Sequence, residues 1–477
     1  MSETLTPLDL TALRNVLGDN GGDPLEPLDL ATLITGPGAL DRLGDVLADL
    51  AGAPGEVVVL AAATSMTMRG SALAEAVGQR VADRFTLNWV VVGPASGSVH
   101  ADEQTVAAAT RAAAGARCVI TVGSGTITDI GKAAVAAGTP LLVVQTATSV
   151  NGYADPFSVL LRSGVKRTTP TRWPDALIAD TDVLLDAPAR LNLAGLGDMA
   201  AMFTATADWY LAALLGAAGP PYRGDVAGLV RPHGERMLSL GGGLACDGGQ
   251  LADLASLLTL SGIGMGVTGS TAPASGMEHA VSHLLEMAAT AAGGTPAEAN
   301  LHGEQVGVAS ITAAAAWAHV RERIAAGGLD QAARLPDPDA VSARISAAFA
   351  RLDPSGAMAA ECLADYAVKI RLLSSGADPL VTLRATWADC DATIGRLLTD
   401  PGKLAAGLRS AGLPVRFADL PVPVDDDEAR WAVASCALQR RRFGVADLAM
   451  LIGAWEADDV DAVLAAAQAA AAAGGAS

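Results

Sequence analysis

Three of the chain's six histidines fall within residues 275–305. His279 and His283 are four residues apart, so on a helix their side chains project from one face. His302 follows on a second apolar segment, 299–316, which could fold back against the first. Imidazoles on two packed helices commonly hold a transition metal. The same spacing also fits partly buried histidines that only form hydrogen bonds, so a metal site and a structural cluster both remain open.

A second candidate for chemistry is the sequence VGSGTITDIGK at 122–132, which follows an apolar run and opens a helical pattern. Gly123 and Gly125 would let backbone amides approach a ligand closely, and a helix N-terminus favours anionic phosphate. The spacing matches neither GxGxxG nor a P-loop, and a tight strand–helix turn without ligand is the alternative. The next apolar run ends in QTATSVNGYADP at 145–156, whose hydroxyls could bind a ribose or nicotinamide amide, or cap the following helix.

The elements that must position these residues alternate between apolar runs and helical patterns in the first part of the chain. The apolar runs lie at 56–63, 87–93, 118–125, 140–146 and 176–180. Continuous apolar strands separated by helices indicate a parallel sheet that helices cover on both faces. The sequence therefore predicts an α/β, Rossmann-like dinucleotide-binding domain over residues 1–185, in which residues 1–50 supply short amphipathic pieces that include a helix leading into the first core strand.

From residue 186 onward the strand signal stops, and Ala/Leu-rich segments with helical periodicity are separated by Gly, Pro and Asp. This pattern predicts an all-α domain over 186–465, followed by a low-complexity tail at 466–477. The three arginines at 440–442 are expected on a helix face, paired with the acids of the sequence VDDDEAR.

The composition excludes several classes of partner. The chain of 477 residues is 51% hydrophobic and carries a net charge of −19. Because it has no Lys/Arg-rich run, we expect neither nucleic acid nor an anionic membrane surface as its partner. We see no uninterrupted apolar stretch of about 20 residues that would span a membrane, and no signal-peptide pattern. The five scattered cysteines form no CxxC pair, which indicates reduced thiols and a cytoplasmic protein.

Several segments occur in one order along the chain: GSGTITDIGK, TATSVNGYADP, GVKRTTP, ALIADTDVL, AGLGDMAAMFTATADWYL, SGMEHAVSH and LHGEQVG. With this order, residues 30–450 resemble the sn-glycerol-1-phosphate dehydrogenase branch of the iron-containing alcohol dehydrogenase and glycerol dehydrogenase superfamily. The resemblance implies the fold shared with dehydroquinate synthase, in which a nucleotide-binding domain precedes a helical domain. It also implies an enzyme that oxidises or reduces CH–OH groups with NAD or NADP.

The resemblance implies that Asp198, in GLGDM, binds one divalent metal together with His279 and His302. One carboxylate and two imidazoles would leave a coordination position open for substrate, as a catalytic metal site requires. Zinc, nickel and iron(II) all accept this ligand set. His283 is then expected beside the substrate, where it could orient a ligand or relay a proton during catalysis.

The resemblance also places the cofactor. The pyrophosphate would lie on Gly123, Ser124 and Gly125. Further cofactor contacts are expected from Asp129, Lys132, Thr146 and Ser149. The first apolar run ends in alanines and lacks an acid for the adenosine ribose, so NADP is permitted as well as NAD.

The substrate contacts include one departure from the family. Asn151 stands where many relatives carry an aspartate that lies near the substrate hydroxyls, so the preference for polyols is open. Asp155 could compensate, although a turn role before a proline is expected for it. Lys166, with Arg167, is the cation proposed to bind a substrate phosphate, and a solvated surface hairpin is the alternative.

Together these expectations describe a metal-dependent NAD(P) dehydrogenase that acts on sn-glycerol 1-phosphate, dihydroxyacetone phosphate or a related small polyol phosphate or ketone, and that can form a homo-oligomer. Two alternatives remain: a sugar-phosphate cyclase or lyase like dehydroquinate synthase, and a non-catalytic nucleotide-binding module. The cyclases generally use Glu as their carboxylate ligand, so Asp198 favours the dehydrogenase. Retention of all three metal ligands argues against a module that has lost catalysis.

Overall fold

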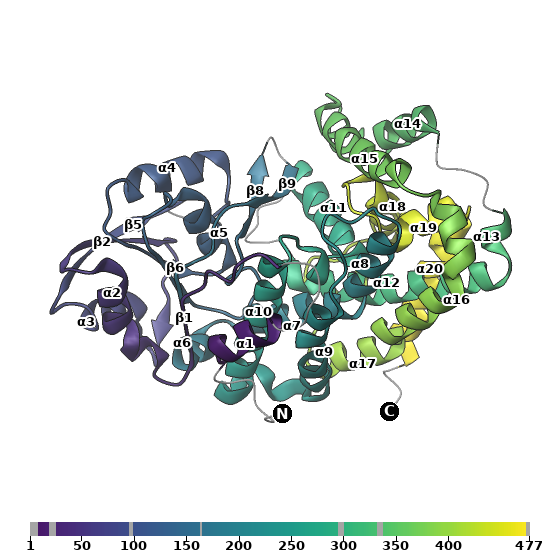
Figure 1. Cartoon of the computed structure of the whole chain (residues 1–477). Helices are drawn as coiled ribbons and strands as arrows, with labels where there is room; N and C mark the ends of the chain where they lie inside the picture. The colour runs from purple at the N-terminus through teal and green to yellow at the C-terminus, as the bar shows by residue number, and fades with distance from the viewer. Residues whose placement is uncertain are drawn as a thin grey trace. The chain divides into compact units, whose positions relative to one another are not determined.

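The computed structural model describes residues 8–18, 25–94, 99–162, 165–293, 300–331 and 337–473. Backbone contacts divide the chain into two compact units, whose elements are labelled in Figure 1. The first unit comprises the chain up to Met199 together with Gly228–Gly269. The second comprises Ala200–Ala227 and the described residues from Ser270 onward. The domain limits at residues 185 and 465 stay predictions.

A six-stranded parallel sheet lies at the centre of the first unit. In spatial order its strands are β1 (Thr32–Gly36), β10 (Ala176–Asp180), β7 (Leu141–Gln145), β6 (Val119–Gly123), β2 (Gly55–Ala61) and β5 (Phe85–Val91). Each pair of neighbouring strands is parallel. The predicted α/β architecture of this part of the chain is therefore confirmed.

Both faces of this sheet are buried, as continuous apolar runs predict. Along β2, Val57 and Val59 pack into one hydrophobic cluster, while Val58 and Leu60 pack into another on the opposite face. The helices that complete the two clusters are α2 (Leu43–Ala51), α3 (Leu73–Gln79), α4 (Glu103–Ala113) and α5 (Gly125–Ala134). The turn from β6 into α5 is the one predicted to bind phosphate.

Strand β1 was not predicted, since residues 1–50 indicated only short amphipathic pieces, one of them a helix. Its five residues pair with β10, with Ile34 opposite Ile178. Most of the strand is half-buried at the edge of the sheet, so it shows no continuous apolar run. Its partner strand lies far along the chain, and strand formation here depends on that tertiary pairing rather than on local sequence.

The segment between β7 and β10 contains an antiparallel hairpin of β8 (Phe157–Arg162) and β9 (Val165–Pro170). A loop, residues 146–156, connects β7 to this hairpin. The first unit is completed by α1 (Leu10–Gly18), the short β3 (Thr67–Met68) and β4 (Ser71–Ala72), α6 (Thr181–Asp186), α7 (Ala189–Met199) and α10 (Gly248–Val267).

Gly195 lies where α7 touches the loop that follows β7. A Cβ built on Gly195 would lie 1.8 Å from the carbonyl oxygen of Thr148, so the backbone would have to shift. We therefore expect Gly195→Ala to lower the free energy of unfolding by about 3 kcal/mol. Urea denaturation followed by circular dichroism measures this loss. Gly228→Ala is the matched control because Gly228 also lies in a helix and an added Cβ meets nothing within 4 Å. Equal stability of the two variants would contradict the close contact.

The second unit is helical, and the described residues after β10 contain no strand. Its helix α11 (Met277–Ala291) packs side by side with α12 (His302–Ala325). Later helices that contact α12 include α17 (Pro401–Ser410), α19 (Val445–Leu451) and α20 (Ala457–Ala473). The other helices are α8 (Ala205–Leu214), α13 (Gly328–Gln331), α14 (Pro338–Phe349), α15 (Ala357–Ser375), α16 (Pro379–Leu397) and α18 (Asp426–Ser435). Helix α9 (Gly224–Ser239) contributes residues to both units. The helical character predicted for this part of the chain is confirmed.

Three features bear on the expectations from composition. None of the five cysteines, all of which lie in the described part of the chain, forms a disulfide, and all but Cys246 are buried. Helix α10 has the length and hydropathy of a membrane span, but 94% of its apolar window is buried inside the protein, as in the core helix of a globular domain. The predicted low-complexity tail continues α20 as far as Ala473, and residues 474–477 lie outside the described part of the chain.

Candidate active site

Three histidines gather where α11 packs against α12 in the second unit. The ring centroids of His279 and His302 are 5.2 Å apart, and those of His283 and His302 are 5.4 Å apart. His279 and His283 lie one helical turn apart on α11, with 6.2 Å between their centroids. His279 is buried, and the other two are half-buried. The expected return of the second apolar segment against the first is confirmed.

Glu278 is fully buried beside His279. Its Oε1 lies 3.1 Å from Nδ1 of His279 and accepts the amide N–H of Gly276. Its Oε2 accepts a hydrogen bond from the hydroxyl of Thr204 at 2.8 Å. Burial alone would favour the neutral acid, but the hydrogen bonds from His279 and Gly276 hold the pKa of Glu278 below its usual value. The burial of this side chain excludes a position on the helix surface.

His302 has two polar neighbours from α11 on one side of its ring. Its Nδ1 lies 3.2 Å from Oγ of Ser282 and 3.2 Å from Oε1 of Glu286. The hydroxyl of Ser282 in turn donates to Oε1 of Gln305 at 3.0 Å. Sequence reasoning missed Glu286, although Ser282 and Glu286 are four residues apart and so share a helix face.

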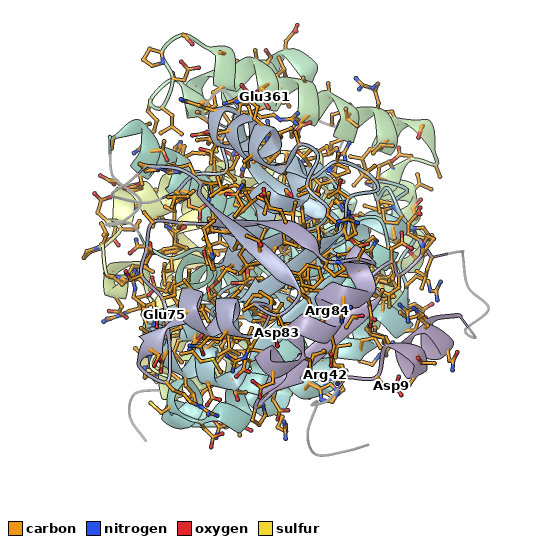
Figure 2. All side chains as sticks on the ribbon, turned by 90° about the vertical axis from the view of Figure 1, so that its left-hand side faces the viewer. Asp9, Arg42, Glu75, Asp83, Arg84 and Glu361 are labelled. Atoms are coloured by element: carbon orange, nitrogen blue, oxygen red, sulfur yellow. The ribbon has the colours of Figure 1, made fainter. Side chains whose placement is uncertain are left out.

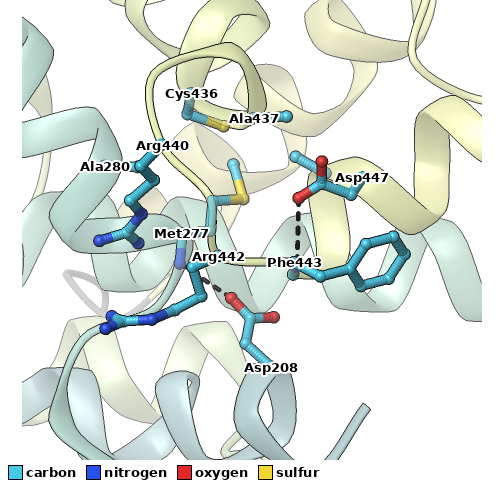
Figure 3. Close-up of a pocket in the computed structure, with 11 residues that line it drawn as sticks. Asp208, Met277, Ala280, Cys436, Ala437, Arg440, Arg442, Phe443 and Asp447 are labelled. Carbon is cyan, nitrogen blue, oxygen red and sulfur yellow. Dashed lines mark hydrogen bonds between the residues drawn. The ribbon is translucent and has the colours of Figure 1, made fainter. Parts of the chain in front are cut away.

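Two arginines in the loop before α19 hydrogen-bond to residues 271–276, which precede α11 (Figure 3). Arg440 donates to the carbonyl oxygen of Gly276 and, at 3.2 Å, to Oγ of Ser275. Arg442 donates to the carbonyl oxygen of Ser275 and, at 2.6 Å, to Oγ1 of Thr271. The expectation of a helix face paired with the acids of VDDDEAR is wrong for these two arginines, which lie in a loop. Charge pairing along the sequence could not reveal them, because their partners are backbone and hydroxyl oxygens from a distant segment.

Asp208 on α8 is buried under the same segment (Figure 3). Its carboxylate accepts the amides of Met277 at 2.8 Å and Val445 at 2.9 Å, and the indole N–H of Trp317 at 3.1 Å. Burial and the neighbouring Glu278 raise the pKa of Asp208 to about 7. The cavity beside it measures about 20 Å³, far below the roughly 300–1,000 Å³ of small-molecule sites. This cluster therefore supports the start of α11 and does not bind substrate.

Asp198, the predicted carboxylate ligand, lies near the end of α7 in the first unit, where it is buried. Its Oδ2 accepts the backbone amide of Asn151 at 3.0 Å. The side-chain amide of Asn151 donates to Oγ of Ser261 on α10 at 3.1 Å. Asp198 and the histidines belong to different units, so their joint binding of a metal stays a prediction, as does the substrate contact of Asn151.

The predicted phosphate loop lies at the carboxyl end of β6. Gly123 ends the strand, Ser124 precedes the helix, and Gly125 is the first residue of α5. A Cβ on Gly125 would lie 2.5 Å from Cγ2 of Val150. Packing against the loop after β7 therefore requires glycine here. The predicted pyrophosphate contacts stay predictions.

The loop after β7 carries the next predicted cofactor residues. The amide of Thr146 donates to the carbonyl oxygen of Gly123 at 3.3 Å, which places the loop directly beside the phosphate turn. Oγ of Ser149 lies 3.2 Å from the hydroxyl of Tyr153. Burial raises the pKa of Tyr153. Sequence reasoning did not single out this tyrosine. The one indication was an aromatic ring with a hydroxyl group in the segment VNGYADP, since a buried tyrosine hydroxyl usually finds a hydrogen-bond partner.

Lys132 is fully buried on α5 and ties that helix to the loop. Its Nζ lies 2.9 Å from Oδ1 of Asp155 and 3.2 Å from Oδ1 of Asp129. It also donates to the carbonyl oxygens of Gly152, at 2.7 Å, and Phe157. Burial raises the pKa of Asp129 to about 6. The expected turn role of Asp155 is present too, because its Oδ1 accepts the amide of Phe157 at 2.8 Å. Cofactor contacts of Lys132 and Asp129 stay predictions.

Lys166 lies on β9 of the hairpin. It pairs with Leu161 of β8, and Arg167 pairs with Leu160. Both cations are half-buried, so the hairpin is present but these side chains are not fully solvated. A contact between Lys166 and a substrate phosphate stays a prediction.

Known proteins resemble this chain in sequence. Residues 34–188 match the family described as iron-containing alcohol dehydrogenase. A glycerol-1-phosphate dehydrogenase (NAD(P)+) from Hyperthermus butylicus is 31% identical over 309 residues, which cover 63% of this chain and 83% of that protein. The protein of the same name from Bacillus licheniformis is 39% identical over 225 residues, covering 45% of this chain and 53% of that protein. The match thus spans about half of the Bacillus protein.

Solved structures resemble the chain in fold. A probable glycerol dehydrogenase from Sinorhizobium meliloti has a TM-score of 0.55 and 17% identity, with 92% of this chain and 97% of that chain covered. Glycerol dehydrogenase from Schizosaccharomyces pombe has a TM-score of 0.54 and 16% identity, with 95% of each chain covered. At these identities the likeness shows the fold, which confirms the predicted fold class.

Proposed function

The chain belongs to the glycerol-1-phosphate dehydrogenase family of iron-containing alcohol dehydrogenases, and on that basis we propose that it is a metal-dependent NAD(P) oxidoreductase. Its reaction transfers a hydride between nicotinamide and the oxygen-bearing carbon of a small polyol phosphate. Dihydroxyacetone phosphate and sn-glycerol 1-phosphate are the proposed pair. The proposal rests above all on the meeting of His279 and His302, whose rings lie 5.2 Å apart between two packed helices.

The donor set fits one divalent cation. His279 and His302 supply two imidazoles, and Asp198, held by the amide of Asn151, supplies a carboxylate. Two imidazoles and one carboxylate are the donors of open catalytic sites for zinc, and nickel or iron(II) also accept them. When bound, the metal supplies Lewis acidity that stabilises negative charge on the substrate oxygen.

The remaining residues bind and orient the reactants. His283, half-buried beside His302, hydrogen-bonds a substrate hydroxyl and holds or relays its proton. The N-terminus of α5, with Gly123 and Gly125, receives the pyrophosphate. Hydroxyls from Thr146 and Ser149, with Asp129 and Lys132, complete the proposed cofactor contacts. Asn151 and Lys166 are the proposed contacts to the substrate hydroxyls and phosphate.

An absorbance assay of the nicotinamide tests this function on the full chain. Dihydroxyacetone phosphate is offered with NADH or NADPH, in the presence of zinc, nickel or iron(II). We expect metal-dependent oxidation of one or both nicotinamides, slower turnover of unphosphorylated dihydroxyacetone, and sn-glycerol 1-phosphate rather than its mirror isomer as product. Absence of turnover with every combination, in protein that binds metal, would contradict the proposal. Consumption of a sugar phosphate without net change in nicotinamide would indicate a cyclase instead.

A further inference from the structure

We propose that Glu278 and Glu286 are positioning residues of the metal site, each fixing one histidine ligand with its hydrogen on Nδ1 and its lone pair on Nε2. This inference rests on the proposed function, because it concerns the two imidazoles assigned there as metal ligands. Neither carboxylate is itself among those ligands.

The hydrogen bonds around His302 determine which ring nitrogen carries its hydrogen. The hydroxyl hydrogen of Ser282 is used on Gln305, so Oγ of Ser282 presents only a lone pair to His302. An ionised Glu286 likewise offers only acceptors. Nδ1 of His302 lies 3.2 Å from each of these oxygens and must therefore donate to them. Nε2, on the opposite side of the ring, keeps its lone pair.

The surroundings of His279 lead to the same assignment. Both oxygens of Glu278 already act as acceptors, one from the amide of Gly276 and one from the hydroxyl of Thr204. Nδ1 of His279, at 3.1 Å from Oε1, therefore donates as well. A metal-binding histidine generally donates its other N–H to a carboxylate or carbonyl, which fixes the ring and raises its basicity as a ligand.

The carboxylates of both pairs come from one helix. Glu278 and Glu286 both lie on α11, and each contacts the Nδ1 side of one of two rings whose centroids are 5.2 Å apart. Glu278 is fully buried and the side chain of Glu286 is 13% exposed, so solvent screens neither interaction strongly. The orientation of both imidazoles is therefore already fixed in the metal-free protein.

The alternative role for Glu286 is that of a ligand to a second metal ion, and experiment distinguishes the two roles. His283, Glu286 and His302 have possible ligand atoms within 4.8 Å of one another, so they could hold a cation of their own. In that case Glu286 would coordinate a second metal and would not fix His302 for the first. The number of metal ions bound per chain distinguishes the two uses.

Zinc affinity of the full chain, measured by competition with a chromogenic chelator, tests the proposal. We expect Glu286→Ala to weaken zinc binding by about 10–100-fold, the usual loss when such a partner is removed. Glu286→Gln and Glu278→Gln keep an acceptor for Nδ1 but lose the charge, so their losses should be smaller. The matched control is Glu322→Gln, an exposed position on α12, which should bind zinc as the unmodified chain does. The proposal is overturned if Glu286→Ala and Glu278→Gln both bind zinc as tightly as the unmodified chain. It is also overturned if the unmodified chain binds a second zinc ion per chain and only Glu286→Ala loses it.

A metal-free measurement separates this inference from the proposed function. Nitrogen-15 shifts of the six histidines in the apoprotein report which ring nitrogen carries hydrogen. His279 and His302 should both carry it on Nδ1, and His302 should become a mixture in Glu286→Ala. An unmodified chain that binds no metal but shows these tautomers contradicts the proposed function and leaves the positioning intact. Mixed tautomers in the unmodified chain overturn the positioning.

Discussion

His302→Ala should reduce kcat/KM for dihydroxyacetone phosphate by at least about 10³-fold, because loss of this proposed metal ligand would remove several kcal/mol of charge stabilisation in the transition state. His302 is the first residue of α12, and its ring contacts those of His279 and His283 on α11. The substitution therefore also removes these ring contacts between the two helices. Steady-state assays with metal-saturated protein measure the effect. Circular dichroism should show that the helices remain, because the buried residues that anchor α12 all follow His302 in the sequence.

The control for this variant lies on the same helix. His319 is hydrogen-bonded through Nε2 to Asp459 at 3.0 Å and is not among the proposed site residues. His319→Ala should therefore keep kcat/KM close to that of the unmodified chain. Full activity of His302→Ala, or of the unmodified chain after thorough chelation, would remove the metal from the proposed mechanism.

Lys132→Met should lower the free energy of unfolding by about 3–5 kcal/mol, the range seen when one partner of a buried ion pair is removed. The methionine would leave Asp129 and Asp155 beside one another without their shared cation, and two carbonyl oxygens would lose a donor. Urea denaturation followed by tryptophan fluorescence measures the loss. The variant should recover part of this stability at acidic pH. Burial raises the pKa of Asp129 above its value in the unfolded chain, so protonation of this carboxyl group favours the folded state as the pH falls.

Arg84→Met provides the matched control for the removal of a cation from the first unit. Arg84 is exposed and is labelled in Figure 2. Surface substitutions of this kind change stability by about 0.5 kcal/mol or less. If Lys132→Met were no less stable than Arg84→Met, the buried network around α5 would not stabilise the fold as its contacts indicate.

The elements that could be predicted from sequence are those whose signal is local. Val57 to Leu60 are apolar without interruption, so a strand buried on both faces is the natural reading of that run. Strand β1 gives no such signal, because it lies at the sheet edge and pairs with β10, more than a hundred residues later. The helices of the second unit were recognisable as a class, since helical periodicity is also a local property.

The candidate site divides in the same way. His279 and His302 stand out by residue type, and the order of segments along the chain drew attention to Asp198. The support for those residues was not predictable, because it depends on which oxygen faces which ring nitrogen. Arg440 illustrates the limit: its sequence neighbours suggest a surface charge cluster, whereas its partner is the backbone of Gly276.

The loop after β7 is joined to α7 at two places, through Gly195 against Thr148 and through the amide of Asn151 on Asp198. The same loop carries Thr146 and Ser149, two of the proposed cofactor contacts, so these residues and the proposed carboxylate ligand Asp198 are held in place by the same packing between the loop and α7. In an enzyme of the proposed kind, the two occupants, NAD(P) and the metal, would then be thermodynamically linked. If bound NAD(P) changes the affinity for the metal by some factor, bound metal must change the affinity for NAD(P) by the same factor. A favourable coupling would mean that loss of either occupant weakens the binding of the other by that same factor.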